Sequence, residues 1–229
     1  MPHAATEPTR SWLVDDAYAA LKDAILANEY PPGHQVSAQE LALRFGMSRT
    51  PVQEAALKLQ QEGLVEILPK RGIRIRALSP EDISENYDVV IAIEAGAAER
   101  IAALPPDVRA VAADALDAAT DAMATALATG DLAGWGAADA TFHRLLIEQC
   151  GNRRFVAIIS MVNAQSHRAR MLIVHLRGNL VSSVAEHRGI IAAIRQGDRA
   201  GAHAAARAHR SRARDELLPL LEKTGLKHF

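Results

Sequence analysis

The segment that decides the fold of the first half runs from residue 37 to residue 63 and reads SAQELALRFGMSRTPVQEAALKLQQEG. Ser37 precedes a helical pattern and Glu40 follows three residues later, which is the signature of a capping box at a helix N-terminus. Gly46 ends this short helix, and Ser48 begins another that carries a proline in its first turn, where a missing N–H is tolerated. Two short helices joined by a tight turn predict a helix-turn-helix.

Two short strands are expected directly after this motif, over residues 64–68 and 73–76, with a turn of sequence PKRG between them. Ile73 and Ile75 alternate with two arginines, so the second strand has one apolar and one basic face. Another helix, over residues 11–29, is predicted ahead of the motif from its apolar period. A helix-turn-helix followed by a basic hairpin predicts a winged helix.

The rest of the chain is expected to be entirely helical. Ser79 suits the N-cap of a new helix, with Pro80 at its first position. Alanine-rich helical patterns follow, separated by breaks that contain glycine or proline. The expected helices cover residues 80–103, 106–129, 131–149, 153–176, 182–196 and 198–223. The sequence therefore predicts a mainly α protein, with a winged helix-turn-helix domain and its small β-hairpin wing over residues 1–78 and an all-α helical bundle over residues 79–229.

Composition limits the possible classes of protein. The chain has 229 residues and a formal net charge of −1, without an apolar run long enough to span a membrane. Its N-terminus does not resemble a signal peptide and the single Cys150 permits no internal disulfide, so we expect a cytoplasmic protein. Between residues 39 and 77, seven basic and four acidic residues give a local charge of +3. This excess suits DNA phosphates, with a solvated basic face as the alternative.

Four potential metal ligands stand out in the second half. Asp139 and His143 are four residues apart, so they share one face of their predicted helix. His187 and His209 flank the helix break at 197–198, and an antiparallel helix pair places them at nearly the same height. One carboxylate and three imidazoles suit a divalent ion such as Zn²⁺, Ni²⁺ or Mn²⁺, among which the sequence does not choose. A structural role for each histidine is the alternative.

Sequence motifs in both halves of the chain match known families. In the first half these are ELA at 40–42, FGMSRTPV at 45–52, EGLV at 62–65 and RG at 71–72. With these stretches the first half resembles the winged-helix domain of GntR-type transcription regulators. In the second half the motifs include Asp139 with FH at 142–143, GN at 151–152, EH at 186–187 and His209. With them the second half resembles the FCD ligand-binding domain of the FadR-like branch of that family, so the two resemblances cover most of the chain.

The resemblance implies a DNA-binding transcription regulator and not an enzyme. Such proteins usually repress, and they bind palindromic operators as symmetric dimers because a two-fold protein contacts two half-sites. The resemblance also implies a small effector, and a carboxylate could occupy the open positions of a metal held by the four ligands.

The residues expected to contact DNA lie in the helix-turn-helix and at the wing. Arg49 is the first candidate for base contact, because a guanidinium bridges guanine O6 and N7, with a phosphate contact as the alternative. Ser48 and Thr50 suit phosphates near a helix N-terminus, although Ser48 is also a simple N-cap candidate. Gly72 is expected to let the wing approach the minor groove. The full set is Gln39, Arg44, Ser48, Arg49, Thr50, Gln53, Lys70, Arg71 and Gly72.

Three positions depart from the family pattern. Gln53, and in the fatty-acid-responsive members Gln39, stand where relatives carry arginine, so we expect an altered operator and a weaker salt dependence. Val90 stands where many FCD domains carry an arginine that holds the carboxylate of the ligand. Arg168 or Arg170, on the helix predicted after Asn152, could substitute for it, with a role as an ordinary exposed surface arginine as the alternative for each. The residues expected to bind the effector are therefore Asn163, Arg168 and Arg170.

Two other functions fit the same residues. One is a regulator whose metal is purely structural and which has no small-molecule effector. The other is a metal-dependent hydrolase in which metal-bound water is the nucleophile. The hydrolase lacks an obvious additional carboxylate as general base, and an enzyme does not need a winged helix.

Overall fold

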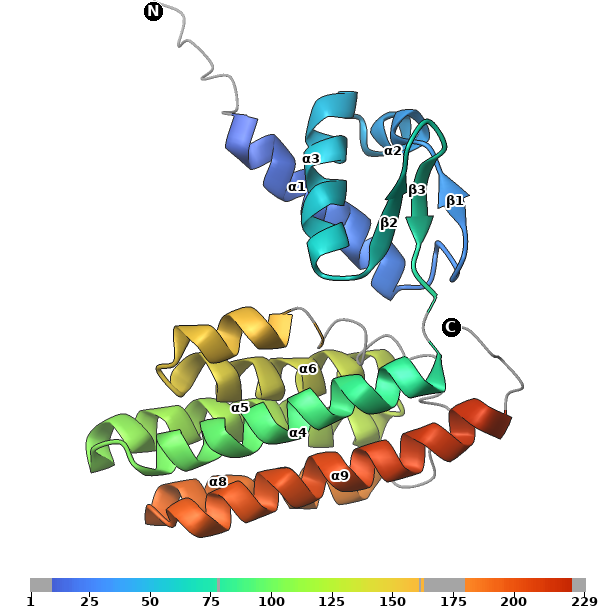
Figure 1. Ribbon diagram of the computed structural model, residues 1–229. Coiled ribbons are helices and arrows are strands. Elements are labelled where there is room, and N and C mark those ends of the chain that lie inside the picture. The colour runs from blue at the N-terminus through green and yellow to red at the C-terminus, as the bar shows by residue number, and fades with distance from the viewer. Residues whose placement is uncertain (1–9, 78, 161, 163–179, 224–229) are drawn as a thin grey trace, which may run out of the picture. The chain divides into compact units, whose positions relative to one another are not determined.

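The computed structural model describes residues 10–77, 79–160, 162 and 180–223. The chain forms two compact units, and the boundary between them falls between Leu78 and Ser79 (Figure 1). The first unit contains helices and a small sheet, and the described part of the second unit is helical. The predicted mainly α class is therefore confirmed.

The first unit is built on three helices: α1 (Arg10–Leu26), α2 (Ala38–Phe45) and α3 (Arg49–Gln61). The predicted capping box of α2 is confirmed, because Ser37 Oγ accepts from Glu40 N at 3.1 Å and Glu40 Oε2 accepts from Ser37 N at 2.8 Å. Helix α1 ends three residues earlier than predicted. The chain turns there, since a left-handed asparagine with φ of 58° follows two residues after the helix.

The sheet has the order β1-β3-β2, with β1 (Gln35–Val36), β2 (Val65–Leu68) and β3 (Gly72–Ile75) all antiparallel to their neighbours. Strands β2 and β3 are the predicted hairpin, and Ile73 and Ile75 are buried while the intervening arginine is exposed. Strand β1 was not predicted. Two residues are too few to show a period, so only their pairing with β3 identifies them as a strand.

Gly72 is required by contacts inside this sheet. Its φ is +96°, and a Cβ on it would lie 2.6 Å from the carbonyl oxygen of Val36. Gly72 therefore approaches β1 closely within the protein. Its close approach to DNA stays a prediction. A side chain at this position would force β1 and β3 apart.

Gly72→Ala is expected to loosen the wing by about 2 to 4 kcal/mol, since it combines a left-handed alanine with a backbone clash. Gly33→Ala is the matched control, because Gly33 also has positive φ (+76°) but open space around its Cβ position. This control should cost only about 1 to 2 kcal/mol. Hydrogen exchange of peptides covering residues 64–76 measures the local effect. Equal protection in the two variants would show that the contact with Val36 is unimportant.

The second unit is a bundle in which α4 packs mainly along α9, and α5 packs along α6 and α8 (Figure 1). Ser79 caps α4 by accepting from Asp82 N at 3.1 Å, and Pro80 is the first helical residue, as predicted. No helix in the described ranges is long and apolar enough to cross a membrane. The helices are α4 (Pro80–Ala102), α5 (Pro106–Thr129), α6 (Leu132–Gln149), α8 (Leu180–Gln196) and α9 (Arg199–Lys223).

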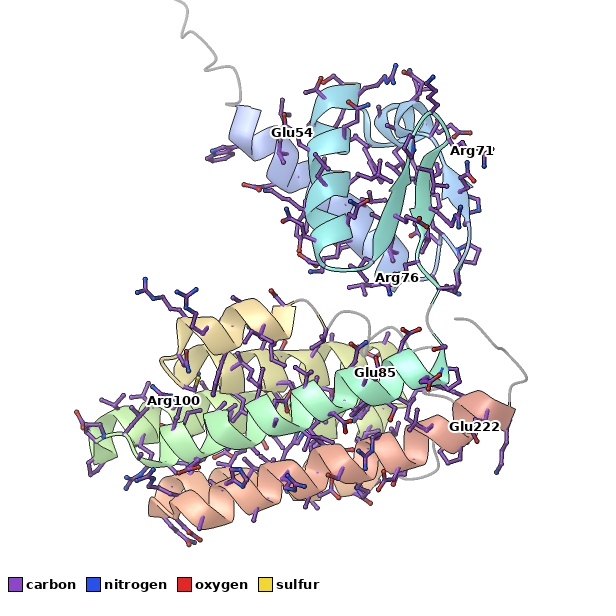
Figure 2. All side chains as sticks on the ribbon, viewed as in Figure 1. Glu54, Arg71, Arg76, Glu85, Arg100 and Glu222 are labelled. Carbon is purple, nitrogen blue, oxygen red and sulfur yellow. The ribbon has the colours of Figure 1, made fainter. Side chains whose placement is uncertain are left out.

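Side chains from these helices fill the interior of the bundle (Figure 2). Alanines such as Ala97, Ala113 and Ala206 are buried between larger residues, and their small size lets the helices approach closely. Polar residues are nevertheless buried in this bundle, and burial of polar groups requires partners. Within the described residues they are Glu94, Thr120, Asp139, His143, Ser183, His187, His209 and Arg210.

Candidate functional site

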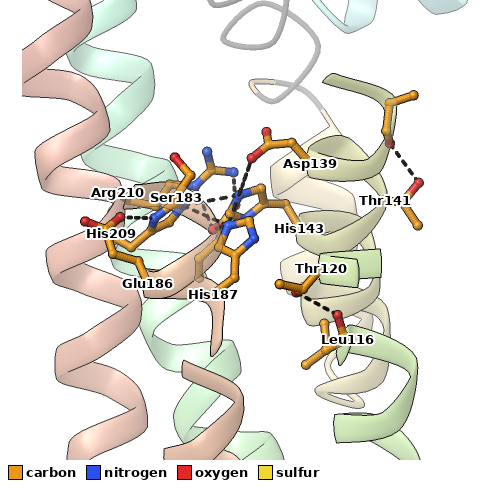
Figure 3. Close-up of polar contacts among 12 residues, drawn as sticks. Leu116, Thr120, Asp139, Thr141, His143, Ser183, Glu186, His187, His209 and Arg210 are labelled. Carbon is orange, nitrogen blue, oxygen red and sulfur yellow. Dashed lines mark hydrogen bonds and ion pairs between the residues drawn. The ribbon is translucent and has the colours of Figure 1, made fainter. Parts of the chain in front are cut away.

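The structure brings the four predicted metal ligands together in the middle of the bundle (Figure 3). Helix α6 supplies Asp139 and His143 from one face, α8 supplies His187 and α9 supplies His209. The Nε2 atom of His209 lies 3.1 Å from that of His187 and 3.4 Å from that of His143. Asp139 Oδ1 is 3.5 Å from His143 Nε2 and 4.0 Å from His187 Nε2. All four side chains are buried.

A buried ion pair contacts His143 at Nδ1, the ring nitrogen that faces away from the other ligands. Glu94 Oε2, on α4, lies 2.8 Å from His143 Nδ1. Arg210 donates to both oxygens of the same carboxylate, with Nε 2.7 Å from Oε2 and Nη2 2.6 Å from Oε1. Burial would raise the pKa of Glu94, but the charge of Arg210 and the contact with His143 hold it well below its usual range. Glu94 is therefore an ionised acceptor.

His209 has a similar arrangement nearer to the surface. Glu186 Oε2 lies 2.7 Å from His209 Nδ1, and Arg212 Nη2 donates to the same oxygen at 2.6 Å. Although its partial burial would raise the pKa of Glu186, hydrogen bonds from His209 and Arg212 lower it to about 2. Two of the three histidines are thus each held by a glutamate that an arginine binds in turn.

These carboxylates fix the hydrogen positions on two imidazoles. An ionised carboxylate only accepts, so Nδ1 of His143 and of His209 must carry the hydrogen. In the neutral forms of these rings the Nε2 atoms are lone-pair acceptors, and they lie 3.4 Å apart. Two lone pairs at this distance repel each other unless a cation lies between them. Carboxylate partners on the outer nitrogens are also what metal-binding histidines commonly have.

The protonation states agree with this arrangement. Burial lowers the pKa of His187 well below its usual range, and the neighbouring histidines act in the same direction. Burial is also the main cause that lowers the pKa of His209 to about 4, against the opposing hydrogen bond from Glu186. Both rings are therefore neutral at neutral pH, which is the form that binds metal. The donor set of three nitrogens and a carboxylate oxygen fits a divalent transition-metal ion.

Sequence reasoning missed the residues behind the ligands. Glu186 directly precedes His187 and Arg210 directly follows His209, but neighbours on a helix point about 100° apart and give no sign of a shared site. Val90, which stands where many FCD domains carry an arginine, is buried in the apolar core of the bundle. The residues expected to bind the effector, Asn163, Arg168 and Arg170, lie outside the described residues.

A second candidate site is a groove of about 650 Å³ between the start of α3 and the hairpin. Arg49 is exposed, and none of the ion pairs between described residues uses it. Lys70 has a left-handed backbone (φ 61°) in the turn between β2 and β3, and the Arg71 side chain is exposed beside it (Figure 2). Six of the residues predicted to contact DNA line this groove: Gln39, Arg49, Gln53, Lys70, Arg71 and Gly72.

The other three predicted contacts lie outside the lining of the groove. Ser48 occupies the N-cap position of α3, as its alternative interpretation expected, and its side chain makes no cap hydrogen bond. Ser48 and Thr50 are both exposed. Arg44 forms an ion pair with Glu29 and donates to Tyr30 Oη at 2.9 Å. Its charge is therefore engaged within the unit.

Comparison with known proteins gives consistent matches. A family model described as "FCD domain" matches residues 85–212, and "Bacterial regulatory proteins, gntR family" matches residues 13–75. The chain is 52% identical over 134 residues (58% of the chain, 78% of the relative) to an HTH-type transcriptional regulator in the TAR-I ttuE-ttuC' intergenic region of Agrobacterium vitis. It is 30% identical to a protein of Paenarthrobacter nicotinovorans named "Probable D-xylose utilization operon transcriptional repressor", over 76% of the chain and 75% of that protein. A solved GntR structure from Rhodococcus sp. RHA1 has the same fold, with a TM-score of 0.73 and 21% identity over 90% of the chain and 97% of its own.

Proposed function

Since this chain belongs to the GntR family of bacterial regulatory proteins and carries an FCD domain, it is a DNA-binding transcription regulator, and we propose that it is a metal-containing repressor released by a small carboxylate. It acts in the cytoplasm as a homodimer on a palindromic operator. The family and the names of its relatives identify a regulator and not an enzyme, so the metal-dependent hydrolase is set aside. Repression is also the role in the name of the Paenarthrobacter relative.

The groove of the first unit supports the DNA-binding part of this proposal. Arg49 stands exposed at the first position of α3, where its guanidinium can reach a base edge in the major groove. Lys70 and Arg71 add two cations on the hairpin, on the other side of the groove. In a symmetric dimer the same set contacts each half-site, which gives the operator its palindromic form.

The three buried imidazoles support the metal part, and the closeness of their Nε2 atoms, 3.1 Å between His187 and His209 and 3.4 Å between His209 and His143, is the observation that carries it. A metal held by Asp139, His143, His187 and His209 would supply Lewis-acid positions for the oxygens of a carboxylate. The acid must bind one arrangement of the protein more tightly than the other in order to change the affinity for DNA. The chain around residues 78–79, between the two units, is where such a change is transmitted.

The proposal is tested by comparing metal-loaded and chelated protein against a panel of small organic acids. We expect one class of acid to raise the melting temperature only when metal is present, because a ligand that binds the native state stabilises it. The same acid should change the affinity for an operator selected in vitro, as measured by fluorescence anisotropy. If chelation destabilises the protein but no acid has any effect, the metal is structural and the effector part of the proposal is wrong.

A further inference from the structure

A buried arginine lies beside the candidate metal site. Arg210 follows His209 on α9, and its side chain is 1% exposed. It is the one fully buried arginine among the residues that the structure describes. A cation is costly to bury and is retained inside a protein only with compensating partners. The partners of Arg210 therefore indicate what this part of the bundle interior can hold.

Glu94 satisfies only part of the guanidinium. An arginine has five N–H donors, and Arg210 uses Nε and Nη2 for the two oxygens of Glu94. The hydrogen bonds between described residues leave Nη1 unused. The same carboxylate also accepts from His143 Nδ1, so its negative charge is shared between two donors. Glu94 holds one edge of the guanidinium in place, and Nη1 on the other edge can donate to an additional acceptor.

The buried charges also favour an additional anion. Glu94 and Asp139 contribute −2 and Arg210 contributes +1, so these described groups sum to −1. A divalent ion at the histidines changes this sum to +1. Glu186 and Arg212 form their own pair and cancel. With a divalent ion bound, these described groups therefore carry one positive charge in excess, and a buried charge in a medium of low dielectric attracts a counter-ion strongly.

Tyr87 provides a second unsatisfied group in the same region. It lies on α4 seven residues before Glu94, which is two helical turns, so both side chains project from the same face. The side chain is fully buried, and its hydroxyl has no hydrogen-bond partner in the described part of the chain. The face of α4 that carries Tyr87 is therefore the face on which Glu94 binds Arg210. A buried hydroxyl without a partner is uncommon in a native protein, and a bound ligand is one explanation.

We propose that Arg210 and Tyr87 form the subsite that recognises the acid group of the effector. Arg210 Nη1 donates to one oxygen of a carboxylate, the Tyr87 hydroxyl donates to the other, and Glu94 keeps the guanidinium in place. This assignment rests on the proposed function, because it names the residues that select the ligand of the same cavity. It also predicts selection by charge, so that a neutral amide of the same shape is rejected.

The test uses the full-length, zinc-loaded protein with acetate, malonate and succinate, each compared with its neutral amide in calorimetric titrations and thermal shifts. We expect at least one acid to bind while its amide does not. Arg210→Met should weaken that acid at least tenfold, since it removes a charged hydrogen bond. Tyr87→Phe should weaken it about fivefold to tenfold without emptying space. Arg195→Met is the control, because it removes an exposed arginine of α8 that pairs with Asp114 and Asp117, and its acid affinity should stay within about twofold of wild type.

Zinc affinity without acid is a second readout. Arg210→Met should bind zinc at least as tightly as wild type, because a buried cation is removed from beside a dication and Glu94 is left to His143 alone. Arg210→Lys keeps the charge and serves if the methionine variant does not fold. Its acid affinity should be intermediate, since lysine lacks the fork of donors.

Each outcome separates the two levels of the proposal. If Arg210→Met and Tyr87→Phe both bind the acid as wild type does, the subsite is wrong while the acid-responsive regulator stands. If an acid and its amide bind equally well, selection by charge is wrong. If wild type binds DNA but responds to no acid, the effector part of the proposed function fails and the subsite fails with it.

Discussion

His143→Ala is expected to remove most of the metal-dependent part of the protein's thermal stability and to lower its affinity for a divalent ion by roughly a hundredfold or more. Loss of a carboxylate behind a metal ligand already costs about tenfold to a hundredfold, and loss of the ligand itself should cost at least that much. Wild-type protein at a metal concentration of 1,000 times Kd gains about 4 kcal/mol from binding. At the same metal concentration a variant that binds a hundredfold more weakly keeps about 1.4 kcal/mol of that gain, so its shift in melting temperature between metal and chelator should be about a third of the wild-type shift or less.

His203→Ala is the matched control for this experiment. His203 lies on α9, as His209 does, but it is six residues away and about 240° round the helix, so it faces elsewhere. Its replacement should leave the metal-dependent shift unchanged. Glu94→Gln should be intermediate, with an affinity reduced by about tenfold to a hundredfold, because the amide no longer holds the hydrogen of His143 Nδ1 as strongly.

The comparison uses the difference between metal-loaded and chelated samples of each variant, and this choice matters because His143 is fully buried. Its loss also removes packing, which lowers the melting temperature of both samples equally. Calorimetric titration with zinc gives the affinity directly. A variant without His143 that keeps the wild-type metal affinity would show that the three imidazoles do not form a metal site.

The arrangement of the metal ligands could be anticipated because it depends on local geometry. Asp139 and His143 share a helix face through their spacing, and Gly197, with φ of +71°, forms the turn that sets His187 opposite His209. Both relations follow from helix periodicity and one recognisable helix break. The capping box at Ser37 was predictable for the same reason, since it involves residues only three apart.

The groups behind the ligands could not be anticipated in this way. Glu94 reaches His143 across 49 residues of sequence, and Arg210 reaches Glu94 across 116. Those contacts exist because α4 packs along α6 and along α9, and nothing in the sequences of these helices fixes their relative rotation. Glu186 shows the same limit, since its neighbour His187 was singled out while its own contact with His209 depends on the angle between two helices. Long-range packing, more than chemistry, therefore set the limit of prediction.

Arg49→Ala is expected to weaken operator binding by about 30-fold to 10⁴-fold. A good bidentate contact to guanine contributes about 1 to 3 kcal/mol, and a symmetric dimer loses two of them, for a total of about 2 to 6 kcal/mol. The exposed position of Arg49 at the start of α3 means that the loss of its side chain leaves no buried group without a partner. The folded domain should therefore keep its stability, which separates this variant from one that merely unfolds.

The salt dependence decides which kind of contact Arg49 makes. If it binds a base, Arg49→Ala should relax sequence preference at one position in each half-site and leave non-specific binding almost unchanged. If it binds a phosphate, the variant should lose affinity for all sequences, and the slope of log K against log salt should flatten by about 0.9 for each contact, or about 1.8 for the dimer. Arg207→Ala, which removes the same charge from an exposed position on α9, is the control and should change neither quantity. Wild-type affinity and specificity after Arg49→Ala would show that the groove between α3 and the hairpin does not hold the operator through this residue.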